Sequence, residues 1–348
     1  MFRKTKICFF GMMIAGLLYV FSLPSAPAEV AATGPRMLVP CGNAIGVKIE
    51  TDGVLVIGIS EFETEQDNME NPSADAKIKQ GDVINAVDGQ MVRNMEELRQ
   101  AVQNSGGQPM QVTLSRGDKE LTVTVTPEKS RVDNSYYIGA WVRDSTAGIG
   151  TMTYYDPATG NFGALGHAIC DIDTNDILRV YQGEVLTASI SAVKQGEAGS
   201  PGELRGIFGD PAGWITTNNK SGIFGTILNE SVLPQHEAIP TANRSEIKEG
   251  KAEILCCVNG TEISSYEIEI QKISPFPKQL TRDMTIKITD EDLLQATGGI
   301  IQGMSGSPII QDGKLVGAVT HVLVNRPEMG YGISIERMMT ESGAGSAN

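Results

Sequence analysis

The sequence is short of positive charge, of aromatic side chains and of histidine. Its 348 residues hold 28 Lys and Arg against 42 Asp and Glu, a formal net charge of -14, and aromatics make up only 5%. A chain with that balance repels nucleic-acid phosphates and offers no basic surface to bind them. We therefore exclude nucleic acid as a partner and expect a globular protein rich in turns, because 39 residues are glycine.

Cysteine is also scarce, and its spacing excludes two common roles. The five cysteines are Cys8, Cys41, Cys170, Cys256 and Cys257. No spacing among them suits a metal site, and adjacent cysteines bridge each other only with strain. We predict no metal and no organic cofactor, and we interpret the cysteines after the first segment as mostly buried small apolar residues, with a disulfide as the alternative.

Long apolar runs are missing except at the N-terminus. Arg3, Lys4 and Lys6 precede an apolar stretch over residues 7–23, and small residues follow it. A positive flank ahead of an apolar run is an export signal, so residues 1–28 are predicted to be a cleaved signal peptide or a retained membrane anchor. The rest of the chain is then expected on the far side of the cytoplasmic membrane.

Residues 42–128 have the pattern of a small β-rich domain with one helix. The β-prone stretch 47–57 contains an Asp-Gly pair, which predicts a hairpin. Asn94 with Glu97 three residues later predicts a capped helix. Alternating apolar residues over 110–125, interrupted by Arg-Gly-Asp, predict a closing hairpin.

A phrase at residues 81–89, Gly-Asp-Val-Ile-x-x-Val-Asp-Gly, precedes the predicted helix. In this order the segment resembles PDZ domains of exported bacterial proteases. Such domains add an extended peptide to a sheet edge, with backbone amides of a tight loop receiving its terminal carboxylate. By position, the resemblance implies that this loop is formed by Asn43, Ala44, Ile45 and Gly46.

Residues 135–343 show many short strand patterns and no long amphipathic helix. Apolar runs over 151–165 flank an Asp-Pro-Ala-Thr-Gly turn and predict a hairpin. Further short strand patterns of the same kind follow up to residue 324. A segment of this length built from short strands fits a double β-barrel.

The phrase Gly-Met-Ser-Gly-Ser-Pro at residues 303–308 is the most informative motif. It is similar to the serine phrase of trypsin-like peptidases, where a glycine-lined turn presents a serine hydroxyl and aims amides at a developing oxyanion. The resemblance implies Ser305 as nucleophile and the amides of Gly303 and Ser305 as the oxyanion hole, with Ser307 as the competing nucleophile. We predict a mainly β protein in which a PDZ-like domain precedes a trypsin-like double barrel.

Three histidines compete for the role of general base. His167 ends a strand pattern near the start of the second domain and precedes the serine in the chain, the order found in trypsin-like enzymes. His236 lies in a polar loop pattern. His321, on the strand after the serine, suits either a pocket wall or a buried position. We predict His167 as the base.

The carboxylate that orients the histidine should lie between the histidine and the serine in the chain. Asp290 is one candidate, with Asp283 and Asp292 close by. Asp290 equally fits the N-cap of a short helix that Gly298 ends, so the residue pattern leaves its role open.

A resemblance over nearly the whole chain bears on this choice. Four motifs resemble those of the stage IV sporulation protein B peptidases of endospore formers: residues 148–153, 162–167, 298–310 and 317–322. In that family a histidine, an aspartate and a serine in matching phrases act together. The resemblance implies that these are His167, Asp290 and Ser305.

The same resemblance implies a biological role. Members are exported from the forespore into the space between its membrane and that of the mother cell. They cut themselves near the N-terminus and cleave a membrane-bound inhibitor of an intramembrane metalloprotease, which releases an active late sporulation sigma factor. Two alternatives stay open: a catalytically silent scaffold with a peptidase fold, and a general envelope quality-control protease.

Overall fold

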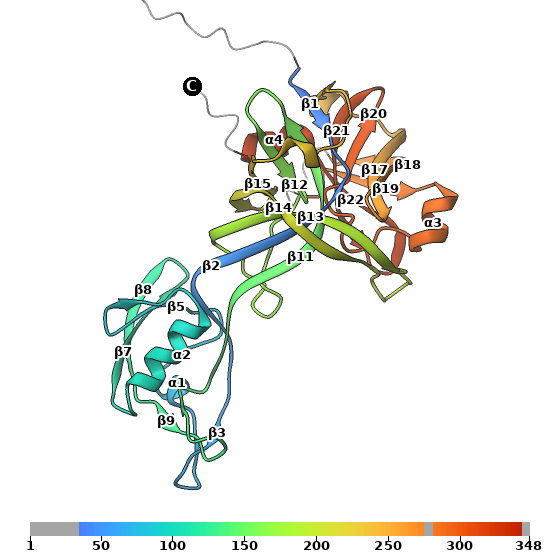
Figure 1. Cartoon of the computed structure of the whole chain (residues 1–348). Helices are drawn as coiled ribbons and strands as arrows, with labels where there is room; N and C mark the ends of the chain where they lie inside the picture. The colour runs from blue at the N-terminus through green and yellow to red at the C-terminus, as the bar shows by residue number, and fades with distance from the viewer. Residues whose placement is uncertain (1–34, 275–280, 343–348) are drawn as a thin grey trace, which may run out of the picture. The chain divides into compact units, whose positions relative to one another are not determined.

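The computed structural model describes residues 35–274 and 281–342, so the predicted export segment, residues 1–28, lies outside the described part. Strands dominate the described residues, which confirms the predicted mainly β fold class (Figure 1). None of the helices in these two ranges is long and apolar enough to cross a membrane.

Six strands pair in a closed ring and form the first barrel of the peptidase part. Their order around the ring is β2 (Ala44–Ile59), β11 (Ala140–Asp156), β12 (Asn161–Ala164), β15 (Gly222–Ile227), β14 (Glu203–Asn219) and β13 (Val180–Lys194). Two short strands, β1 (Met37–Pro40) and β16 (Ile239–Pro240), extend the pairing from β11. Alternate side chains point inward, and Ile45, Phe162 and Ile223 belong to the resulting core.

A second closed barrel follows, drawn in orange and red in Figure 1. Its strands are β17 (Gly250–Asn259), β18 (Glu262–Ile273), β19 (Met284–Ile288), β22 (Arg326–Ser334), β21 (Lys314–Leu323) and β20 (Pro308–Gln311). The short helices of the two barrels are η1 (Glu230–Val232), η2 (Arg244–Glu246), α3 (Glu291–Thr297) and α4 (Ile335–Glu341). Ile254, Ile268 and Ile286 are completely buried in the core of the second barrel.

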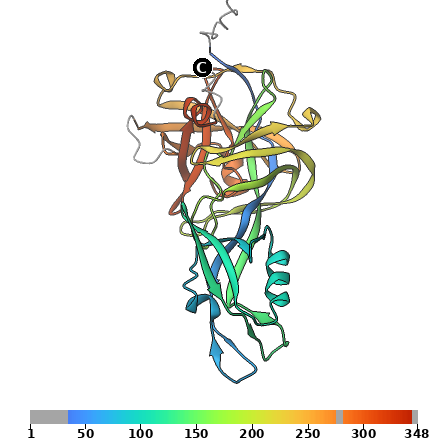
Figure 2. The same cartoon turned by 90° about the vertical axis from the view of Figure 1, so that its left-hand side faces the viewer.

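The PDZ-like unit lies in the chain between β2 and β11. Its sheet joins β2 to β5 (Val83–Val87), β7 (Met110–Arg116) and β8 (Lys119–Val125), with α2 (Met95–Asn104) lying beside the strands in Figure 2. Leu98 and Val102 of α2 pack into a core with Ile84 and Val112. The small elements of the unit are β3 (Phe62–Glu63), β4 (Met69–Glu70), α1 (Pro72–Asp75), β6 (Gln90–Met91), β9 (Glu128–Lys129) and β10 (Tyr136–Tyr137).

The hairpin predicted around Asp52 and Gly53 does not form, because β2 is a single strand of 16 residues. Gly53 has φ +106°, and a Cβ there would lie 2.6 Å from the carbonyl oxygen of Ile84. Glycine therefore lets β2 bend and lets β5 approach its backbone, as at a bulge, without reversing the chain. One strand thus runs from the first barrel into the PDZ-like sheet, a continuity that the Asp-Gly pattern concealed.

The other local predictions agree with the structure. Asn94 caps α2 and accepts a hydrogen bond from the Glu97 amide at 2.9 Å. Strands β7 and β8 form the predicted closing hairpin, and β11 pairs with β12 across the Asp-Pro-Ala-Thr-Gly turn. Three of the cysteines are free and buried: Cys41, Cys256 and Cys257. Cys170 is exposed, because it lies in the loop after β12, so the cysteines are mostly buried, as predicted.

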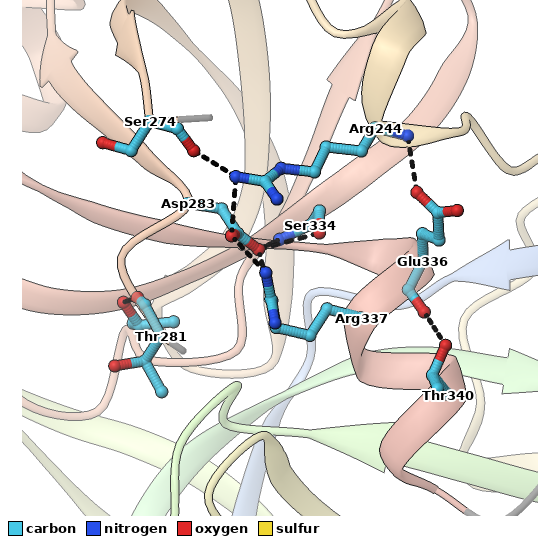
Figure 3. Close-up of polar contacts among 9 residues, drawn as sticks. Arg244, Ser274, Thr281, Asp283, Ser334, Glu336, Arg337 and Thr340 are labelled. Carbon is cyan, nitrogen blue, oxygen red and sulfur yellow. Dashed lines mark hydrogen bonds and ion pairs between the residues drawn. The ribbon is translucent and has the colours of Figure 1, made fainter. Parts of the chain in front are cut away.

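A buried carboxylate ties α4 to the second barrel (Figure 3). Asp283 accepts hydrogen bonds from the amide and hydroxyl of Ser334 at 2.9 and 2.8 Å, and from two nitrogens of Arg337 at 3.1 Å. The guanidinium of Arg244 lies 3.4 Å away. A buried charge so fully paired has a structural role, so Asp283, an alternative for the orienting carboxylate, is engaged elsewhere.

Candidate active site

A cleft of about 490 Å³ brings together Ser305, His167 and His321. Its walls come from both barrels: residues 146–149 of β11 on one side and residues 320–322 of β21 on the other. No charged side chain lines the cleft among the residues that the structure describes. The two residues that sequence analysis selected as nucleophile and base therefore meet in one place, although 138 positions separate them.

The serine lies on a turn that only glycine can form. Gly303 and Gly306 have φ of +97° and +98°, the left-handed region that side chains disfavour. A Cβ on Gly306 would lie 2.0 Å from the Thr151 carbonyl oxygen. The turn leaves Ser305 partly exposed in the cleft, whereas Ser307 is completely buried and its hydroxyl donates to the Met304 carbonyl at 2.7 Å. Ser305, and not Ser307, faces the cleft.

The hydrogen bonds of Ser305 and His167 define their resting state. The Ser305 hydroxyl donates to the Thr320 carbonyl at 2.8 Å. Nδ1 of His167 lies 2.8 Å from the Ala168 carbonyl oxygen, which can only accept, so Nδ1 carries the proton and Nε2 keeps its lone pair. Burial lowers the pKa of His167, which keeps the ring neutral at pH 7. The histidine is therefore held in the tautomer that a general base requires.

A strained turn positions His167 in the cleft. Leu165 has φ +68° and Gly166 has φ +69°, so two successive left-handed residues end β12. Left-handed backbone at a non-glycine residue costs about 1–3 kcal/mol and concentrates at functional sites. A Cβ on Gly150 would lie 2.1 Å from a methyl carbon of Leu165, so the glycine makes room for this turn.

His321 is a member of the same site. Its ring centroid lies 4.9 Å from that of His167, with the planes tilted by 42°. Burial, together with His167 and Arg282, lowers the pKa of His321 to about 4, so it is neutral at pH 7. Its buried Nδ1 has no hydrogen-bond partner within the described ranges. The third histidine, His236, lies 2.9 Å from the Pro40 carbonyl and is absent from the cleft walls.

The structure does not bring Asp290 to His167. Asp290 is the N-cap of α3, where its two oxygens accept from the amides of Leu293 at 2.9 Å and Glu267 at 3.3 Å. Gly298 ends the helix with φ +74°. This arrangement is the structural alternative that the sequence left open, and the Ala168 carbonyl takes the orienting position beside His167.

We expect the two roles of Asp290 to separate on substitution. Asp290→Ala should lower the free energy of unfolding by about 1 kcal/mol through loss of the cap, and should reduce turnover because α3 leads directly into the Ser305 turn. Asp290→Asn, which caps equally well, should restore both. Melting curves and peptidase assays on the two variants make the comparison. A folded but inactive Asn variant would show instead that a carboxylate is needed, as the family resemblance implies.

The loop predicted to bind a peptide carboxylate is not a loop. Ala44, Ile45 and Gly46 lie in β2, where β11 pairs with all three on one edge and β13 pairs with Ile45 and Gly46 on the other. A peptide cannot add to a strand whose two edges are already paired, so this prediction is wrong. Asn43 precedes the strand, and its carbonyl accepts from the Met152 amide at 3.1 Å.

The predicted oxyanion donors are free. Neither the Gly303 amide nor the Ser305 amide donates a hydrogen bond to any described residue, although the carbonyls around them are all bonded. Two barrels with a cleft between them, a serine on a glycine turn and a neutral histidine opposite it define a serine-type peptidase of the trypsin-like class.

Comparison with known families agrees. The profile of the SpoIVB peptidase S55 family matches residues 134–339, more than half of the chain, and a PDZ domain profile matches residues 45–126. The chain belongs to the SpoIVB peptidase S55 family.

Individual relatives match over smaller parts. The regulator of sigma-W protease RasP of Bacillus subtilis is 33% identical over 67 residues, 19% of this chain and 16% of RasP. The chain spans 16% to 40% of the curated relatives that it matches. The active form of the Rv3671c protease of M. tuberculosis is 16% identical, with TM-score 0.33, over 57% of this chain and 74% of that one. The thermostable serine protease AL20 of an extremophilic microorganism is 14% identical, with TM-score 0.36, over 58% and 93%.

Proposed function

We propose that this protein is a signalling endopeptidase that is exported across the cytoplasmic membrane, cuts itself near the N-terminus and then cleaves a membrane-associated regulator of an intramembrane metalloprotease. Membership in the S55 family supports this role, as do the export pattern of residues 1–28 and the similarity to RasP. The setting would be the space between forespore and mother cell, and the outcome activation of a late sporulation sigma factor.

The proposed reaction transfers an acyl group to water. Nε2 of His167 takes the hydroxyl proton as Ser305 Oγ attacks a peptide carbonyl, and the amides of Gly303 and Ser305 receive the oxyanion. The proton then passes to the leaving amine, and water hydrolyses the acyl-enzyme by the same steps in reverse. The Ser305 hydroxyl must leave the Thr320 carbonyl for the attack, a shift that substrate entry into the cleft can cause.

One observation carries the proposal: one cleft is lined by a partly exposed serine, by a neutral histidine with Nε2 unprotonated, and by the two residues, Gly303 and Ser305, whose amides make no hydrogen bond to a described residue. A binding scaffold with a silent peptidase fold has no need to keep backbone amides unpaired, because each such group costs free energy when buried. This argues against the scaffold alternative.

The substrate class is tested with the purified full chain. We expect one new N-terminus to appear on incubation, detected by mass spectrometry, and cleavage of a co-expressed membrane-anchored regulator of an intramembrane metalloprotease. Unfolded casein should be spared. Extensive casein degradation without a defined self-cleavage site would support the quality-control alternative, and a complete lack of cleavage would support the scaffold.

A further inference from the structure

We propose that Thr151, on β11 of the first barrel, is a positioning residue that sets the geometry of the oxyanion hole in the second barrel; this rests on the peptidase function proposed above. Thr151 is 1% exposed. Its amide donates to the Ser305 carbonyl at 3.0 Å, and its hydroxyl donates to the Gly303 carbonyl at 2.8 Å. One side chain and one amide thus hold the two residues whose own amides would bind the oxyanion.

Holding these carbonyls fixes the direction of the amide at Gly303. The amide belongs to the peptide plane of the Gln302 carbonyl, which accepts from the Leu204 amide at 2.8 Å. The next plane is held by Thr151 through the Gly303 carbonyl. A peptide unit is planar, so anchoring both planes fixes φ and ψ between them. Glycine would otherwise rotate more freely, and the direction of the Gly303 amide would no longer be fixed.

The same construction holds Ser305. Its amide shares a plane with the Met304 carbonyl, which accepts from the Ser307 amide at 3.0 Å and the Ser307 hydroxyl at 2.7 Å. The following plane is anchored when the Ser305 carbonyl accepts from Thr151. In a trans peptide the carbonyl and the amide point in opposite directions. A carbonyl anchored by a hydrogen bond therefore points the amide of the same peptide plane away from the donor of that hydrogen bond.

Thr151 also contacts the histidine segment. Its carbonyl accepts from the Leu165 amide at 3.3 Å, and Leu165 begins the left-handed turn that leads to His167. A single buried residue of the first barrel is therefore bonded to both halves of the catalytic apparatus. Loss of the Thr151 hydroxyl would remove the hydrogen bond to the Gly303 carbonyl. The two backbone hydrogen bonds of Thr151, to the Ser305 carbonyl and from the Leu165 amide, would stay in place.

The expected loss of rate follows from the sensitivity of catalysis to the position of the oxyanion-hole donors. Displacing a catalytic group by about 1 Å costs on the order of 10²-fold in rate. Removing one oxyanion donor costs about 10²–10³-fold. Since the hydroxyl of Thr151 acts on one donor indirectly, we expect the lower end of this range.

The test uses the full chain and a fluorophosphonate probe, with the maximal labelling rate kinact and the half-saturation constant KI measured separately. Thr151→Val keeps the branched shape and removes the hydroxyl. It should lower kinact about 10²-fold while KI stays within about 3-fold. Thr151→Ser keeps the hydroxyl and should label at close to the wild-type rate. If the valine variant does not fold, Thr151→Cys, a weaker donor, should show a smaller fall, about 10-fold.

Thr153→Val is the matched control. Thr153 lies on the same strand, is completely buried and donates to the Gly306 carbonyl at 2.7 Å, but Gly306 is not an oxyanion donor. Both valine variants should lose similar thermal stability, while Thr153→Val keeps kinact near wild type. The proposal would be overturned by equal losses of kinact in the two valine variants, or by a Thr151→Val variant whose kinact is unchanged. It would also be overturned if kinact of Thr151→Ser or Thr151→Cys departed from the values expected above. Failure of the peptidase function itself would appear differently, as an unlabelled wild-type protein.

Discussion

Ser305→Ala should abolish covalent labelling by a fluorophosphonate and lower peptide cleavage by about 10⁶-fold, because the residue supplies the attacking oxygen and a nucleophile and its base act as a unit. The fold should survive, since the substitution removes only the hydroxyl bond to the Thr320 carbonyl. Melting curves check the fold, and labelling of wild type and variant side by side checks the chemistry.

Ser307→Ala is the control two residues away. The Ser307 hydroxyl is completely buried and bonds to the Met304 carbonyl, which keeps a second bond from the Ser307 amide. The variant should lose about 1 kcal/mol of stability and retain labelling and most of its turnover. Equal inactivation of both serine variants would remove Ser305 from its assigned role.

His167→Ala should lower turnover about as much as the serine change, on the order of 10⁶-fold, because without a base the hydroxyl is a poor nucleophile. The proximity of His321, with ring centroids 4.9 Å apart, makes His321→Ala the necessary comparison. We expect that variant to stay active at a reduced rate. An inactive His321→Ala beside an active His167→Ala would transfer the role of base to His321.

The pH profile gives an independent check on the base. Activity requires neutral imidazole, and burial lowers the pKa of His167, so the acid limb of kcat/KM should fall below the ordinary histidine value of about 6.5. Activity is then fully present at pH 7 and is lost as the pH falls through the lowered pKa. An acid limb at or above the ordinary value would contradict the assignment.

The local elements of this fold were predictable because their signals are short in range. The Asn94 cap of α2 depends on a neighbour three residues away, and the β7–β8 hairpin on alternation across one turn. Ser305 was predictable for the same reason, since its turn is built from glycines on either side. The role of Asp290 was ambiguous because an aspartate that caps a helix and an aspartate of a catalytic triad look the same in a sequence.

The sequence by itself determined the mainly β class and the glycine turn that presents Ser305, and it predicted His167 among three histidines as the base. Tertiary structure alone decided that β2 continues through Gly53 into the PDZ-like sheet and that its residues 45 and 46 are paired on both edges. It also placed Asp290 on α3, His321 beside His167, and Thr151 against the turn of Ser305. These contacts join residues up to 154 positions apart, where backbone pairing and close packing, not local propensity, choose the partners.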